Sequence, residues 1–84
     1  MRSVRLRHRE KTLRSVLVAG RQKKSVTQAQ LAELLGRPQS FVSKYESGER
    51  GLGVAEMLEI CEAIALNPLT VIRAVLYGNQ AEET

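Results

Sequence analysis

The residues whose types and spacing could do chemistry lie in a short helix that the sequence predicts over residues 38–46. At about 100° per residue, one side of this helix is polar and the other is apolar. Gln can bond bidentately to adenine, Ser can bond to several bases, and Lys can donate to guanine or to phosphate. The polar side therefore has the groups needed to read base edges in the major groove, namely Gln39, Ser40, Ser43 and Lys44.

Catalytic and metal chemistry have few candidate residues. The 84 residues include one His, one Cys and no Asp. A zinc site, or a Cys–His or Ser–His–Asp arrangement, thus cannot be built within one subunit. Two glutamates acting as an acid–base pair remain formally possible, but no cleft-forming architecture fits a chain of this length. We therefore expect a protein that is not an enzyme and that needs no cofactor or metal.

The charge is unevenly divided along the chain. Residues 1–24 carry nine Arg or Lys against one Glu, whereas residues 25–84 carry four against eight. A basic cluster attracts polyanions such as nucleic acid and makes binding salt-dependent. Charge alone leaves two alternatives open, a membrane surface as the partner and a solvated basic tail that only aids solubility.

The length suits a single domain. We expect a basic N-terminal arm without regular structure over residues 1–9, a folded domain over residues 10–78 and a polar tail over residues 79–84. The single Cys, with no long apolar run and no signal-peptide pattern, favours a reducing, aqueous compartment. The sequence therefore predicts a cytoplasmic protein with no membrane partner.

The first two predicted helices are marked by their ends. The first begins near Glu10, after the arm. The second begins at Gln28, because Thr27 and Gln30 have the spacing of a capping box. It ends at Gly36, where glycine suits the left-handed conformation that closes many helices.

Three further helices are predicted from proline and from the apolar spacing. Pro38 is accepted at the start of a helix and opens the third. The fourth spans residues 54–66, and the fifth spans residues 69–77. The predicted inward residues are Val42 and Tyr45 in the third helix and Met57, Leu58, Cys61, Ile64 and Ala65 in the fourth. The outward residues of the fourth form an acidic side that we expect to point away from DNA: Glu56, Glu59 and Glu62.

Residues 27–50, TQAQLAELLGRPQSFVSKYESGER, resemble the helix-turn-helix of the Cro/C1 repressor family, also called the xenobiotic-response-element family. The resemblance implies an all-α fold, the five-helix lambda-repressor-like DNA-binding domain, over about residues 10–77. The matching framework residues are Leu31 and Ala32 where the two helices cross, Gly36 in the turn, and Val42 and Tyr45 inside the recognition helix.

The resemblance also implies roles for individual residues in binding double-stranded DNA. Gln28 matches the position that holds a phosphate at the start of the second helix. Gln39 and Ser40 match base-contacting positions, and Lys44 matches a position that contacts a base or a phosphate. The resemblance therefore implies that the third helix recognises the DNA base sequence.

Residues around the recognition helix have more than one interpretation. Arg37 and Arg50 flank it and could each bind phosphate or remain solvated, and Ser43 has the same two alternatives. The resemblance implies a salt bridge between Arg21 and Glu46. Such a bridge would be a structural contact between the first and third helices.

Together these features predict a sequence-specific transcriptional regulator, most simply a repressor that acts by operator occupancy. One alternative is an antitoxin that binds both its operator and a toxin protein, using the arm or the tail. Another is a helix-turn-helix that binds only another protein, which the polar side of the third helix disfavours. The fifth helix is more apolar than one buried stripe needs, which favours a homodimer, although the surplus could instead cover the domain's own core.

Overall fold

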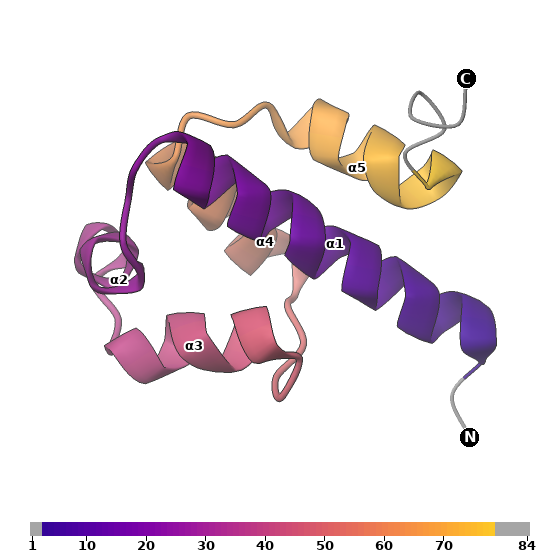
Figure 1. Cartoon of the computed structure of the whole chain (residues 1–84), viewed down its shortest axis with the longest axis horizontal. Helices are drawn as coiled ribbons and strands as arrows, with labels where there is room; N and C mark the ends of the chain where they lie inside the picture. Colours follow the sequence, from indigo (N-terminus) through magenta and orange to yellow (C-terminus); the bar gives the residue numbers. More distant parts are fainter. Residues whose placement is uncertain (1–2, 79–84) are drawn as a thin grey trace.

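Five helices follow one another along residues 3–78, the part of the chain that the computed structural model describes, with no strand among them (Figure 1). They are α1 (Val4–Lys23), α2 (Gln28–Leu35), α3 (Gln39–Ser47), α4 (Val54–Ala63) and α5 (Pro68–Tyr77). The expected all-α architecture of five helices is confirmed. The predicted tail over residues 79–84 lies outside the described part, as do residues 1–2. Within residues 3–78, none of the helices combines the length and the hydrophobicity that crossing a bilayer requires.

α1 begins at Val4 rather than near Glu10, so the prediction of an irregular arm is wrong for residues 4–9. The hydroxyl oxygen of Ser3 accepts a hydrogen bond from the Leu6 amide at 3.0 Å and so caps the helix. The Arg and Leu residues that follow are good helix formers. Amphipathic spacing did not reveal this segment because it extends past the body of the molecule, where no buried stripe is required (Figure 1).

The helix-turn-helix forms as predicted between α2 and α3. The Gln30 amide donates to the Thr27 hydroxyl at 3.0 Å, and the Thr27 amide donates to the Gln30 side chain at 2.9 Å, which completes the capping box. Gly36 ends α2 with a φ of 68°, a left-handed conformation that glycine adopts without steric cost. Pro38 is the cap before α3 rather than its first residue, and α3 continues to Ser47.

α1 and α4 end in the same type of turn. Ser25 and Ala65 have φ of 59° and 54°, and the next amide donates back to the helix at 3.2 Å from Val26 and at 2.8 Å from Leu66. α4 thus ends at Ala63, and the prediction that it continues to Leu66 is wrong. The apolar spacing runs past the true end because Val26 and Leu66 both fold back onto the core after their helix has ended.

α5 begins at Pro68, one residue before its predicted start. The Asn67 side chain accepts a hydrogen bond from the Leu69 amide at 2.9 Å, and proline suits the first position because no donor is needed there. Gly78 ends the helix, as predicted.

The core draws on all five helices. Its fully buried side chains are Leu17, Leu31, Val42, Tyr45, Ile60, Cys61 and Val71. On α4 the inward side is rotated from the predicted one, because Ile60 is buried whereas Leu58 and Ala65 are exposed. The predicted inward residues of α4 that are buried are Met57, Cys61 and Ile64.

α1 crosses the molecule between α5 on one side and α3 on the other (Figure 1). Gly20 lies where α1 meets the turn after α4, and a Cβ atom there would lie 3.0 Å from Leu66 Cδ2. α2 and α3 pack against each other, and α3 forms the lower edge of the molecule in this view (Figure 1). This arrangement presents one side of α3 to solvent.

Candidate nucleic-acid interface

The inner side of α3 is fixed by three buried side chains. Phe41, Val42 and Tyr45 are at most 8% exposed. The rings of Phe41 and Tyr45 lie 5.6 Å apart between centroids and are tilted by 58°, within the range of favourable aromatic pairs. The predicted inward positions of Val42 and Tyr45 are confirmed. Because these contacts span the helix, they set which side of α3 faces outward.

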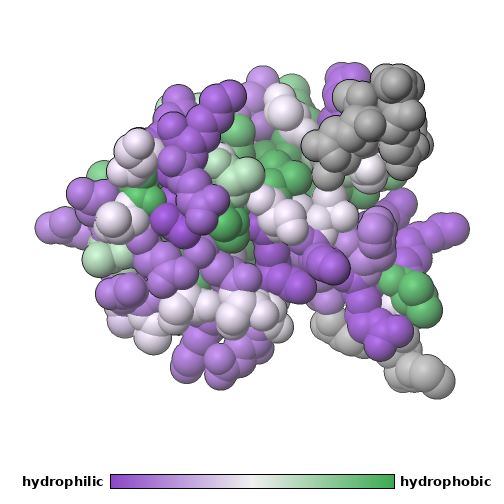
Figure 2. Space-filling model, viewed as in Figure 1, coloured by the Kyte–Doolittle hydropathy of each residue, from purple (hydrophilic) through white to green (hydrophobic). Residues whose placement is uncertain are grey.

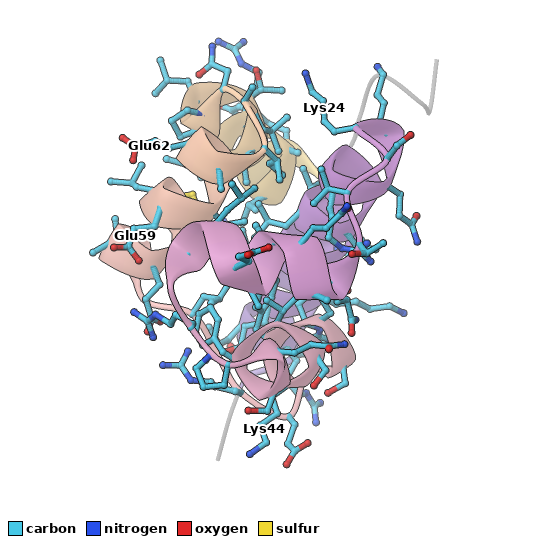
Figure 3. The ribbon with its side chains drawn as sticks, turned by 90° about the vertical axis from the view of Figure 1, so that its left-hand side faces the viewer. Lys24, Lys44, Glu59 and Glu62 are labelled. Carbon is cyan, nitrogen blue, oxygen red and sulfur yellow. The ribbon has the colours of Figure 1, made fainter. Side chains whose placement is uncertain are left out.

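The four predicted polar residues come together on the outer side of α3. Gln39, Ser40 and Lys44 are exposed, and Ser43 is half-buried. The Ser43 hydroxyl donates to the Ser40 carbonyl at 3.2 Å, so the helix itself engages it. Lys44 points away from the body of the molecule, below α3 (Figure 3). Figure 2 shows that the lower edge carries mainly hydrophilic and near-neutral residues, whereas most hydrophobic residues lie higher up, with a further group at the right.

Glu46, near the end of α3, joins three helices. Arg21 of α1 donates to it twice, from Nε at 2.8 Å and from Nη2 at 3.1 Å, and Gln28 of α2 donates from Nε2 at 2.8 Å. Arg21 also donates from Nη1 to the Val26 carbonyl at 2.6 Å. The Arg21 and Glu46 side chains are only 10% and 7% exposed, and their hydrogen bond raises the pKa of Arg21. The bridge expected between Arg21 and Glu46 is confirmed.

Gln28 is held more firmly than the predicted residues on α3. Its side chain is half-buried, and its amide nitrogen donates to Glu46. A glutamine amide carries two N–H donors, so one donor remains for another acceptor. The structure thus orients this amide where the start of α2 meets the end of α3.

Arg37 and Arg50, the two predicted flanking residues, each lie against the ring of Phe41. Their guanidinium carbons lie 4.5 Å and 4.8 Å from its centroid, close enough for cation–π attraction. Arg50 also donates to both carboxylate oxygens of Glu56, at 3.0 Å and 2.7 Å. Arg37 makes looser ion pairs, 3.6 Å from Glu56 and 3.7 Å from Glu59. Both arginines are thus tied to α4, Arg50 firmly and Arg37 loosely.

The prediction that Glu56 faces outward is wrong. Its carboxylate turns back toward the loop, where the Gly53 amide donates to Oε1 at 3.0 Å in addition to the two bonds from Arg50. These hydrogen bonds, that of Arg50 first, hold the pKa of Glu56 down at about 2. The spacing of Gly53 and Glu56 is that of a capping box and could have predicted the first contact. The contact with Arg50 crosses a loop and has no comparable local signal.

The other two acidic residues of α4 do project outward, as predicted. Glu59 and Glu62 are exposed and point to a different side of the molecule from Lys44 (Figure 3). Their carboxylates are therefore directed away from the outer side of α3.

Comparisons with known proteins agree with this geometry. A family model described as Helix-turn-helix matches residues 17–70. A solved structure described as an XRE-family like protein from Pseudomonas syringae pv. tomato str. DC3000 is similar to this chain, with a TM-score of 0.79 and 38% sequence identity. The similarity covers 84% of this chain and 87% of that one. No curated protein matches the chain.

Proposed function

Because the chain belongs to the Cro/C1-type, or XRE, helix-turn-helix family of DNA-binding regulators, we propose that it is a sequence-specific repressor that acts by occupying its operator. The observation that carries the proposal is the division of α3. Its inner side is buried and fixed, while its outer side presents three exposed polar residues, Gln39, Ser40 and Lys44. The major groove is about 12 Å wide and admits one such helix.

Within this proposal the residues of α3 have distinct roles. Gln39 lies in the first turn and reads a base, with adenine as the best match to its amide. Ser40 reads a base beside it, and Lys44, one turn later, donates to guanine or to phosphate. In the free protein the Ser43 hydroxyl donates to the Ser40 carbonyl, and on DNA it donates to a phosphate instead.

Residues outside α3 hold the phosphates that position the helix. Gln28 uses the amide donor that Glu46 leaves available, at the positive end of the α2 dipole. Arg37 turns from its loose pairs with α4 to a phosphate more readily than Arg50, because Arg50 is held by two hydrogen bonds of 3.0 Å and 2.7 Å. Arg50 therefore contributes the smaller phosphate contact of the two.

The proposal includes a homodimer formed through α5. Leu69, Ile72 and Leu76 recur at helical spacing along one side of α5, and they are 69%, 42% and 51% exposed. An apolar stripe on an exposed helix suits a second copy of the same stripe. Two copies would place their recognition helices about 34 Å apart on a palindromic site.

Selection of bound sequences from random double-stranded DNA tests the proposal. We expect a palindrome to be enriched, and we expect transcription from a promoter that contains it to fall when the protein is present. Gln39→Ala should weaken binding to the selected site by about 5- to 150-fold, equivalent to about 1–3 kcal/mol, because a base contact is lost. The absence of an enriched sequence would overturn the proposal.

A matched pair of lysine variants locates the interface. Lys44→Ala and Lys24→Ala each remove one positive charge, but the two side chains lie at opposite ends of the view in Figure 3. We expect Lys44→Ala to weaken binding to the selected site clearly more than Lys24→Ala, because only Lys44 lies on the outer side of α3. Equal losses of affinity in the two variants would show that the outer side of α3 does not face the DNA.

Sedimentation of the free protein tests the α5 dimer separately. We expect Ile72→Asp to shift a dimer toward monomer, because it places a charge within the apolar stripe. A wild-type protein that is monomeric both free and on the palindrome would contradict the dimer and leave the DNA-binding proposal standing.

A further inference from the structure

The N-terminal part of α1 is a helix that extends beyond the matched family region. The family model begins at residue 17, whereas α1 begins at Val4, so about 20 Å of helix precedes the match. Residues 4–8 are exposed, and this part of α1 passes the end of α3 to reach the lower right of the molecule (Figure 1). Core packing alone therefore does not account for its length or its composition.

The basic residues of this segment lie on two different sides of α1. Arg5 and Arg9, with His8, line a hollow against the end of α5. Lys11 and Arg14 instead line a groove that the end of α3 closes on the other side. The structure thus divides one basic stretch of sequence between an α5 side and an α3 side.

Three basic residues make up the α3 side, which we call the α1 ridge: Arg7, Lys11 and Arg14. Arg7 belongs to it because residues four apart lie on the same side of a helix, and Lys11 is four residues further along. Seven residues of helix separate Arg7 from Arg14, a length of about 10 Å. This equals the axial rise of about three phosphates along one DNA strand.

The α1 ridge is continuous with the outer side of α3. Ser47, the last residue of α3, is exposed and lines the same groove as Lys11 and Arg14. Arg14 packs against Gly48, where an added Cβ would lie 2.9 Å from the guanidinium carbon. The ridge therefore begins where the candidate interface ends and is held there by direct packing.

Acidic groups near the ridge are few and lie around Arg14. Glu46 lines the groove with Lys11, but Arg21 and Gln28 already bind its carboxylate. Glu10 and Glu49 lie with Arg14 around the adjoining hollow above the loop after α3. Glu10 lies on the same side of α1, three residues after Arg7, but its carboxylate turns toward the loop, where a Cβ added at Gly51 would lie 3.9 Å from Oε2. The carboxylates thus gather toward the loop after α3 and leave positive charge on the side of the ridge formed by Arg7 and Lys11.

We propose that the α1 ridge is a second DNA-contacting surface, which binds the phosphates of the duplex beside the half-site that α3 reads. The inference rests on the proposed function, because it requires α3 to face the groove. A helix holds the three cations at fixed spacing, so less conformational entropy is lost on binding than with a flexible arm. Arg5 and Arg9 face α5 and take no part in this contact.

Two matched double variants test the ridge. Arg7→Ala with Lys11→Ala removes two charges from the ridge, and Arg5→Ala with Arg9→Ala removes two charges from the α5 side of the same turns. Alanine is the best helix former, so α1 should persist in both, which circular dichroism checks. Any general attraction by net charge falls equally in the two proteins.

The measurement is the salt dependence of binding to a random-sequence duplex. We expect the slope of log affinity against log salt to become shallower by about 2 in the ridge variant, because two phosphate contacts are lost, and by less than half of that in the other. Equal changes in the two variants, or no change in the ridge variant, would overturn the inference. Random DNA keeps the two failures apart, because a missing operator would refute the proposed function without altering this comparison.

Discussion

Two arginine–glutamate pairs with the same chemistry occupy different surroundings in this molecule. Arg21 donates twice to Glu46, and Arg50 donates twice to Glu56, with shortest distances of 2.8 Å and 2.7 Å. The first pair is almost buried, at 10% and 7% exposure, whereas the second is 39% and 20% exposed. Bond length alone therefore does not distinguish their roles.

The difference in burial does distinguish them. A buried charge that loses its partner leaves the other charge unpaired away from water, which is costly. A pair that lies partly in water can exchange its partner for water at a smaller cost. We infer that Arg21 and Glu46 hold α1, α2 and α3 together, whereas Arg50 and Glu56 shape a surface that can adjust.

The largest expected effect is that of Arg21→Ala, which should lower the free energy of unfolding by about 3–5 kcal/mol. The substitution leaves the buried Glu46 carboxylate with only the Gln28 bond and also removes the donor to the Val26 carbonyl. Urea denaturation at low temperature measures the loss, because a domain of this size has only about 4–13 kcal/mol in total.

Arg50→Ala is the control for this comparison. It removes the same kind of pair from a more exposed site, so we expect a clearly smaller loss of stability than with Arg21→Ala. If the two variants were equally destabilised, burial would not be what separates the pairs. Arg21→Lys keeps the charge but loses the paired geometry and should fall between the two.

Lowering the pH should gradually remove the contribution of the Arg50–Glu56 pair to stability. The pKa of Glu56 falls from its ordinary value of 4.5 to about 2 in the folded chain, so its contribution is present above 4.5 and is lost as the pH falls toward 2. Glu56→Gln should therefore be less stable than the wild type near neutral pH and should converge with it near pH 2. A stability difference that stays constant across this range would contradict the depressed pKa.

The smallest effect concerns a buried polar group that has no partner. Among the described residues, the Tyr45 hydroxyl is buried without a hydrogen bond, and burial raises its pKa, which keeps it neutral. Tyr45→Phe should leave stability unchanged or raise it by about 1 kcal/mol, because an unsatisfied group is removed and the ring remains. Thermal unfolding with calorimetry measures this, and a clear loss would show that the hydroxyl has a partner after all.

Local signals predicted the parts of the fold that are fixed by neighbouring residues. Thr27 and Gln30 located the start of α2, and Gly36 located its end, because caps act within a few residues of sequence. The start of α1 at Val4 was missed, since an exposed helix needs no apolar stripe. The end of α4 was missed because Leu66 packs on the core from a turn.

The candidate site divides in the same way. Helical periodicity predicts that Gln39, Ser40 and Lys44 lie together on the outer side of α3. The structure confirms that all three are exposed there. The contact between Gln28 and Glu46, and that between Arg50 and Glu56, join residues from different elements. Such contacts depend on how the helices pack, and no spacing in the sequence encodes them.

The two similar turns after α1 and α4 are places where the folded domain could be made more stable. Ser25 and Ala65 hold a left-handed backbone that costs a residue with a side chain roughly 1 kcal/mol or more and costs glycine almost nothing. Ala65 lies in the connection between α4 and α5, outside α3 and the α1 ridge. A more stable variant of this domain can therefore be made by placing glycine in these turns, while the residues proposed to contact the duplex stay unchanged.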